Sequence, residues 1–161
     1  MFQVYVVFIE CLRSVKGGLV CGSKMEDFIG VKYKLKSSDN FDDYLKFIEV
    51  GLLSRKTANA VSPVCVLTRD NDGVYTLTMT TTFRTVKMSF KLGEEFIEER
   101  PDGAKVKSLL TIEGNKLIQT QTENNGRKST HVREFTKDKL TVTTTAEGWD
   151  GRCIRVYEVL P

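Results

Sequence analysis

Hydrophobic and polar residues alternate along the first regular stretch of the chain. Val31, Tyr33 and Leu35 are apolar, and a lysine follows each of them. A period of two is typical of a β-strand with one apolar face and one solvated face. The pattern therefore predicts a strand that begins near Val31.

The period changes in the next segment, where apolar residues follow helical spacing. Positions i, i+3, i+4 and i+7 of one helix face are occupied by Phe41, Tyr44, Leu45 and Ile48. Asn40 is expected to cap the start of this helix, and Gly51 suits a helix terminus. A second short helix is predicted at about residues 52–60, because Pro63 and the residue before it stop a helix. The two helices form one helix–turn–helix early in the chain.

The remainder of the chain has the rhythm of an antiparallel meander. Turn signals recur about every 10 to 13 residues, with one gap of about 20, at residues 70–73, 92–93, 101–103, 113–115, 124–126, 137–138 and 148–151. Runs rich in Val, Thr, Phe and Tyr lie between them. Counting these runs predicts about ten strands, one before the helices and nine after them.

An up-and-down sheet of this size is expected to close into a barrel, which removes its exposed edges. A barrel of more than about eight strands has an interior too wide for side chains alone to fill. Hydroxyl residues occur on many strand positions, including Thr76, Thr78, Thr80 and Ser108. Buried hydroxyls need partners, which a hydrated cavity supplies. We therefore expect an all-β fold with a hydrated interior.

Composition is that of one soluble globular domain. The chain has 161 residues, of which 40% are hydrophobic and 28% charged. The net charge of +3 is too weak to indicate nucleic acid binding, and basic and acidic residues are interspersed. No nucleic acid partner is expected.

The four cysteines, Cys11, Cys21, Cys65 and Cys153, are far apart and form no C-x-x-C pair. The single histidine, His131, adds no cluster of metal ligands. We therefore expect free thiols in a reducing compartment, with no metal and no cofactor.

The first 24 residues differ from the rest of the chain. The apolar run at residues 2–9 is far shorter than the roughly 20 residues that span a bilayer. No basic residue precedes it, and only residues 20–22 fit a signal-peptide cleavage site. We expect an N-terminal extension at residues 1–24 outside the fold, a domain at residues 25–161, and no secretion.

Arg155 and Tyr157 are two residues apart, so their side chains share one face of a strand. In a closed barrel, Arg133 could lie beside them. The pattern alone leaves the face open and favours an exposed pair, because the apolar Ile154 and Val156 suit the interior equally well.

His131 precedes Arg133 by two residues and Cys153 precedes Arg155 by two, so each is expected to share the face of its arginine. His131 either is a satisfied wall residue or contacts ligand and water in its neutral form. Cys153 would need an adjacent base to act as a nucleophile, and packing is the simpler expectation.

Seven segments of the chain carry motifs that together identify a family. They are V-K-Y-K-L-K-S-S-D-N-F-D-D-Y-L-K-F-I at 31–48, V-G-L-L-S-R-K at 50–56, T-T-F-R-T at 81–85, M-S-F-K-L-G-E-E-F at 88–96, D-G-A-K-V-K-S at 102–108, V-R-E-F at 132–135 and C-I-R-V-Y at 153–157. In order and spacing, these segments resemble the intracellular fatty-acid-binding proteins, a family that includes the cellular retinoid-binding proteins. The resemblance extends over essentially all of residues 25–161.

The resemblance implies a flattened, ten-stranded antiparallel barrel, or β-clam, with the helix–turn–helix as a lid between the first two strands. It implies that Arg133, Arg155 and Tyr157 bind a ligand carboxylate, because relatives that bind neutral retinol have glutamines at the arginine positions. Phe41 and Phe83 match the portal residues of the family. The expected protein is a monomeric carrier of a long-chain fatty acid, with retinoic acid as the alternative ligand.

His131 and Cys153 are expected to line the cavity. The stretch at residues 147–152 is a residue or two longer than in the family, which predicts a larger last hairpin.

Three basic residues, Lys46, Arg55 and Lys56, fall on the predicted lid helices. They form either an ordinary solvated face or a surface for transient contact with anionic membranes. In some relatives, matching residues form a nuclear-import surface. The resemblance therefore implies a protein of the cytoplasm that also enters the nucleus.

A lipid-modifying enzyme on the same barrel is the less favoured hypothesis. Such an enzyme would use Cys65 or Cys153 as its nucleophile, but no set of nucleophile, base and orienting group is evident. We therefore expect no catalytic residues.

Overall fold

A computed structural model describes residues 24–161 of the chain. The predicted extension at residues 1–24 lies outside the described residues, apart from Lys24, and so do Cys11 and Cys21. The first described element is a short 3-10 helix, η1 (Met25–Phe28).

Strand β1 (Lys32–Asp39) is followed by helices α1 (Phe41–Phe47) and α2 (Leu52–Ala60), close to the positions that the sequence predicts. Nine strands follow: β2 (Val64–Arg69), β3 (Tyr75–Thr80), β4 (Thr85–Phe90), β5 (Phe96–Glu99), β6 (Lys105–Glu113), β7 (Lys116–Thr122), β8 (Lys128–Phe135), β9 (Lys139–Ala146) and β10 (Trp149–Val159). The count of one strand before the helices and nine after them is confirmed.

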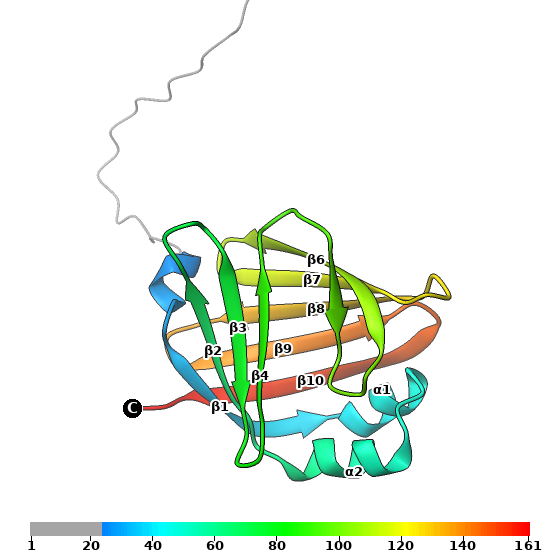
Figure 1. Ribbon diagram of the computed structural model, residues 1–161. Helices are drawn as coiled ribbons and strands as arrows, with labels where there is room; N and C mark the ends of the chain where they lie inside the picture. The colour runs from blue at the N-terminus through cyan, green and yellow to red at the C-terminus, as the bar shows by residue number, and fades with distance from the viewer. Residues whose placement is uncertain (1–23) are drawn as a thin grey trace, which may run out of the picture.

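All ten strands form one antiparallel sheet in the order β4-β3-β2-β1-β10-β9-β8-β7-β6-β5. The sheet curls into a nearly closed barrel, with β4 and β5 as its two edges (Figure 1). The rings of Phe90 on β4 and Phe96 on β5 stack at 6.4 Å between centroids, so aromatic packing joins the edges at that point. The predicted up-and-down barrel is confirmed.

An apolar cluster closes the end of the barrel that carries η1. Phe28 stacks on Phe135 at 6.0 Å, and Tyr33 meets the same ring edge-on at 5.7 Å. Burial raises the pKa of Tyr33 to about 12, and its hydroxyl donates to the carbonyl oxygen of Thr136 at 3.1 Å. This end of the barrel is therefore apolar and tightly packed.

The helices α1 and α2 lie at the opposite end, between β1 and β2 in the chain (Figure 1). Asn40 stands at the cap position of α1, but its side chain makes no capping hydrogen bond. It adopts a left-handed backbone with φ of 54° and donates to the carbonyl oxygen of Arg152 at 3.2 Å. Asn40 thus ties the start of α1 to β10, a role that the expected cap did not include.

The threonines that suggested a hydrated interior lie on the outer face. In β3 the buried positions are Tyr75 and Leu77, and the threonines alternate with them. Thr76, for example, pairs with the hydroxyl of Ser89 at 2.9 Å on that face. Ser108 does lie inside and is fully buried. The threonine part of that interpretation was wrong, because period-two alternation alone does not say which face is the interior.

Candidate functional site

The predicted carboxylate-binding residues lie on the inner faces of β8 and β10, on either side of β9. Val142 of β9 lies opposite Arg133 of β8 on one side and opposite Arg155 of β10 on the other. Because neighbouring strands are about 4.8 Å apart, the two arginines start about 10 Å apart at one level of the barrel. Tyr157 follows Arg155 at the next inward position, and it is 2% exposed.

Arg155 lies beneath the first lid helix. Its guanidinium carbon is 4.1 Å from the ring centre of Phe41 on α1 and 5.6 Å from that of Tyr157. Its Nε donates to the hydroxyl of Ser38 at 3.1 Å. A register shift between Leu35 and Ser37 in β1 brings Ser38 opposite Arg155. The predicted portal residue Phe41 thus contacts a predicted ligand-binding arginine.

Arg133 is an interior cation that forms no ion pair with the side chains of residues 24–161. Burial lowers the pKa of its guanidinium, although nearby Cys65, Glu98 and Tyr157 partly offset the effect. Its Nη1 is buried, and no atom of the described part of the chain accepts a hydrogen bond from it. A buried charge of this kind is costly until an anion or another acceptor reaches it.

Tyr157 is suited to act as a donor beside the arginines. Burial raises the pKa of its hydroxyl, and the nearby positive charge of Arg155 opposes this only in part. The hydroxyl therefore stays protonated at neutral pH. The three side chains together offer two guanidinium groups and one hydroxyl, all of them donors that match a carboxylate.

His131 lies one inward position from Arg133, opposite Thr144 of β9. Its Nδ1 is 2.8 Å from the Thr144 hydroxyl, and its Nε2 is 3.1 Å from Oε1 of Gln121. Burial, and then the charge of Arg133, lower its pKa to about 3. His131 is therefore neutral, and its Nε2–H donates to Gln121 while Nδ1 accepts from Thr144.

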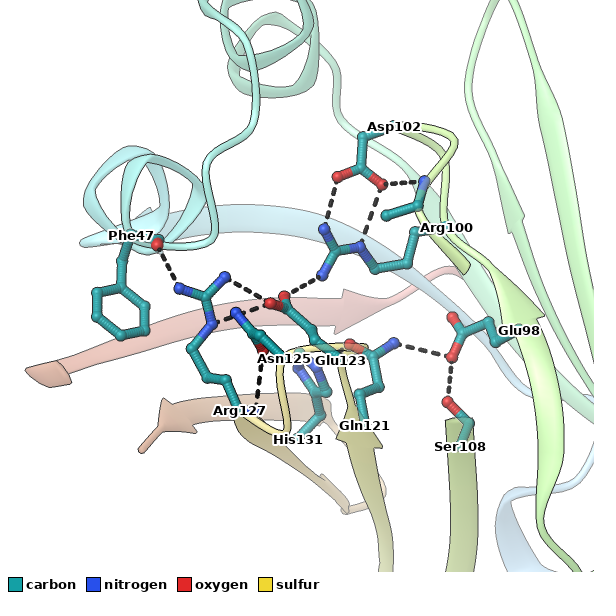
Figure 2. A network of polar contacts seen from close by, with 11 residues as sticks. Phe47, Glu98, Arg100, Asp102, Ser108, Gln121, Glu123, Asn125, Arg127 and His131 are labelled. Atoms are coloured by element: carbon teal, nitrogen blue, oxygen red, sulfur yellow. Dashed lines mark hydrogen bonds and ion pairs between the residues drawn. The ribbon is translucent and has the colours of Figure 1, made fainter. Parts of the chain in front are cut away.

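A polar network continues from His131 across the inner face of the barrel (Figure 2). Gln121 donates through Nε2 to Glu98 at 2.8 Å. Gln119 and Ser108 donate to the same carboxylate oxygen at 2.7 Å and 2.5 Å. Sequence analysis missed this wall. The one available signal was that Gln119 and Gln121 share the face of the buried Leu117.

Four charged side chains join two turns of the barrel to the end of α1 (Figure 2). Arg100 bonds Asp102 at 2.6 Å and Glu123 at 3.0 Å. Glu123 also accepts from Arg127 at 2.5 Å, and Arg127 donates to the carbonyl oxygen of Phe47 at 3.1 Å. All four side chains are less than a fifth exposed. The network holds the last residue of α1 against the β7–β8 turn.

Aromatic packing fixes the same helix to the last hairpin. Trp149 stacks on Phe47 at 6.0 Å and lies 5.6 Å from the ring of Tyr44. Between the pairs Trp149–Ala146 and Cys153–Thr144, β10 advances four residues while β9 advances two. The extra length predicted for residues 147–152 is thus a bulge in β10, which places the indole against α1.

Cys153, predicted to line the cavity, packs in this helix–barrel cluster and is 1% exposed. Burial raises the pKa of its thiol, and of the Cys65 thiol, to about 11. Thiols of raised pKa are poor nucleophiles, because the reactive form is the thiolate.

Helix α2 and the β3–β4 turn carry exposed apolar residues. Phe83, the second predicted portal residue, is 87% exposed, and Leu53 of α2 is 81% exposed. Two of the three basic residues on the helices form ion pairs with α1. Lys46 bonds Asp42 at 3.0 Å, and Arg55 bonds the same carboxylate at 3.2 Å. The positive charge of this surface is therefore largely balanced.

Residues 24–161 contain neither a cluster of metal ligands nor a helix that could span a membrane. No group of three or more His, Cys, Asp or Glu side chains there is arranged to hold a metal ion. No helix of that part of the chain has the length and apolarity to cross a bilayer.

Comparisons with known proteins show which family the chain is similar to. The model of the Lipocalin / cytosolic fatty-acid binding protein family matches residues 30–158. A fatty acid-binding protein from Tyrophagus putrescentiae is 44% identical over 117 residues, which are 72% of this chain and 87% of the relative.

Solved structures of similar proteins have the same fold. The fatty acid-binding protein from brain tissue of Drosophila melanogaster is 48% identical, with a TM-score of 0.75 over 81% of this chain and 98% of its own. The fatty acid binding protein of Schistosoma mansoni, solved in complex with arachidonic acid, is 34% identical, with a TM-score of 0.78 over 86% of this chain and 100% of its own.

Proposed function

The chain belongs to the lipocalin / cytosolic fatty-acid binding protein family, and from this membership we propose that it is a carrier of long-chain fatty acids. The fatty acid lies inside the barrel, where the protein shields its tail from water during transport or storage. The carboxylate is bound by Arg133, Arg155 and Tyr157.

The observation that carries this proposal is the unpaired guanidinium of Arg133. Its Nη1 is buried without a partner, and burial lowers its pKa. A carboxylate removes both penalties, because it supplies the missing acceptor and the opposite charge. Arg155 and Tyr157 donate from the same side, so they fix the orientation of the head group.

The tail supplies most of the affinity. Each buried CH₂ group contributes about 0.8 kcal/mol before the costs of association. A charge-assisted hydrogen bond adds roughly 1.5–3 kcal/mol. A tail of more than ten carbons therefore outweighs the head group, whose part is to select acids over neutral lipids.

The substitution Arg155→Gln tests the assignment. It removes the charge but keeps a polar side chain, so fatty-acid binding weakens while a neutral retinoid alcohol binds as before. A displacement titration with both ligands measures this, and equal loss for acid and alcohol would point to general damage of the barrel. An unchanged affinity for the fatty acid would contradict the assignment of Arg155 to the carboxylate site.

Retinoic acid is the less favoured ligand. It shares the carboxylate and the long apolar body, but the similar proteins are named for fatty acids and one of them holds arachidonic acid.

A carrier without catalysis is the role that fits the chemistry of the interior. The two described thiols have raised pKa values, and the neutral His131 is held between Thr144 and Gln121. The side chains that a nucleophilic mechanism needs are therefore engaged or unreactive.

The carrier works as a monomer in the cytoplasm and also in the nucleus, and it exchanges lipid in transient contacts with anionic membranes. The lid helices make this contact through Lys46, Arg55 and Lys56, of which Lys56 has no ion pair within residues 24–161. Reversal of all three charges is expected to slow ligand transfer to anionic vesicles. If the variant and the wild type transfer ligand at equal rates, the basic residues do not make the membrane contact, and the exposed Leu53 and Phe83 are the remaining candidates.

A further inference from the structure

The polar wall of the barrel contains a buried acceptor that no group of residues 24–161 satisfies. Gln119 is 1% exposed, and its Oε1 is buried without a hydrogen-bond partner. Its Nε2 donates to Glu98 at 2.7 Å, with Ser108 as a further neighbour at 3.3 Å. Because a carboxylate only accepts, the amide nitrogen must face Glu98, and the oxygen is left free.

The position of Gln119 relates this acceptor to the carboxylate site. Gln119 of β7 lies opposite His131 of β8, and Leu117 lies opposite Arg133. Two residues along a strand span about 7 Å, so Gln119 stands one level from the arginines, on the side of the lid helices. A tail that leaves Arg133 toward the lid passes this level.

We propose that the barrel has a second recognition site, at Oε1 of Gln119, for a hydroxyl group part-way along the tail of a fatty acid. The hydroxyl donates to Oε1 of Gln119, the buried acceptor in the Glu98–Ser108–Gln119–Gln121 wall that has no partner within residues 24–161. An unsubstituted tail leaves this oxygen unsatisfied. The inference deepens the proposed function and rests on it, since the carboxylate sets the register of the tail.

The chemistry of the site separates a hydroxyl from other oxygen groups. A ketone only accepts, so it gains nothing at Oε1 and meets the negative charge of Glu98 beyond it. A hydroxyl beside the carboxylate stays at the level of the arginines and does not reach Gln119. Among these ligands, only a fatty acid with a hydroxyl group in the middle of its tail is therefore expected to bind more tightly than the unsubstituted acid.

The test is a displacement titration of the full chain with stearic acid, its positional hydroxy isomers and the matching keto acids. We expect at least one mid-chain hydroxy acid to bind about two- to tenfold more tightly than stearic acid, and its keto analogue to bind more weakly. If no hydroxy isomer exceeds stearic acid, or the ketone equals the alcohol, the second site is refuted.

Substitution at the acceptor gives an independent test. Gln119→Leu should reverse the preference, so that the hydroxy acid binds less tightly than stearic acid. Thr143→Val, which removes a polar group from the outer face of β9, serves as the control and should keep the preference. If Gln119→Leu does not fold, the wild-type ligand series decides alone.

The two proposals fail in different ways. Binding of stearic acid without a hydroxyl preference overturns only the second site. Absence of binding by every acid overturns the carrier function and the second site together.

Discussion

The two helices of the lid differ in how they are held. Tyr44 and Leu45 of α1 are buried, and Trp149, Arg127 and Asn40 each tie this helix to the barrel. Helix α2 has no buried residue. Among the described residues, the ion pair of this helix runs from Arg55 to Asp42 of α1 and not to the barrel.

The difference assigns separate tasks to the two helices. Helix α1 carries Phe41, which lies on the guanidinium of Arg155, so anchoring α1 keeps the roof of the carboxylate site in place. Helix α2 can separate from the barrel at a lower cost in free energy than α1, because its movement exposes little buried apolar surface to water. We expect ligand to pass on the side of α2 and Phe83.

The largest effect on this comparison is expected from Trp149→Ala. It removes the ring that packs on Phe47 and Tyr44, and should lower the free energy of unfolding by about 2–3 kcal/mol. Leu53→Ala on α2 is the matched control and should stay within about 0.5 kcal/mol of the wild type. Urea unfolding measures both, and equal losses would contradict the distinction between the helices.

A somewhat smaller loss is expected from Gly151→Ala. A Cβ atom at this position would lie 2.3 Å from the indole of Trp149, so the ring must move away from α1. We expect about 2 kcal/mol of destabilisation. In the Trp149→Ala background the same change should be nearly neutral. A full loss in that background would show that the glycine acts through the backbone and not through the ring.

Acidification should lower the stability of the barrel beneath α1 through His131. The ring centre of His131 is 5.9 Å from that of Tyr44 on α1. The pKa of His131 is about 3 in the folded protein, below its ordinary value of 6.5, so the unfolded chain binds one more proton between these values. The stabilisation is complete above pH 6.5 and is lost as the pH falls, by about 1.4 kcal/mol per unit. His131→Gln should remove this part of the slope, as chemical denaturation at several pH values would reveal. Parallel slopes would contradict it.

The fold could be predicted from the sequence because the local patterns of apolar residues and turn residues agree with the strands and helices of the barrel. Turn residues predicted seven of the eight turns between consecutive strands from β2 to β10. Apolar spacing predicted α1, and the stop at Pro63 predicted where α2 ends. The turn between β3 and β4 was missed, since it has no glycine. Thr81 organises it instead, with its hydroxyl accepting from the amide of Arg84 at 3.1 Å and donating to the carbonyl oxygen of the same residue at 3.0 Å.

The site was only partly accessible from the sequence. Pattern alone favoured an exposed Arg155 and Tyr157, because a polar side chain inside a barrel contradicts the usual apolar-in rule. The family motifs reversed that expectation. The polar wall could not be foreseen, because Glu98, Gln119 and His131 lie on three strands whose register no local pattern specifies.

The central claim is that the interior arginines select an acid, and the affinity ratio between a fatty acid and the alcohol of equal chain length tests it most directly. Arg133→Gln should weaken acid binding by about 10- to 100-fold and leave the alcohol within about threefold. Arg152→Gln, an exposed change on β10, should leave both affinities unchanged. An acid-to-alcohol ratio that is the same in the wild type and in Arg133→Gln would contradict the account.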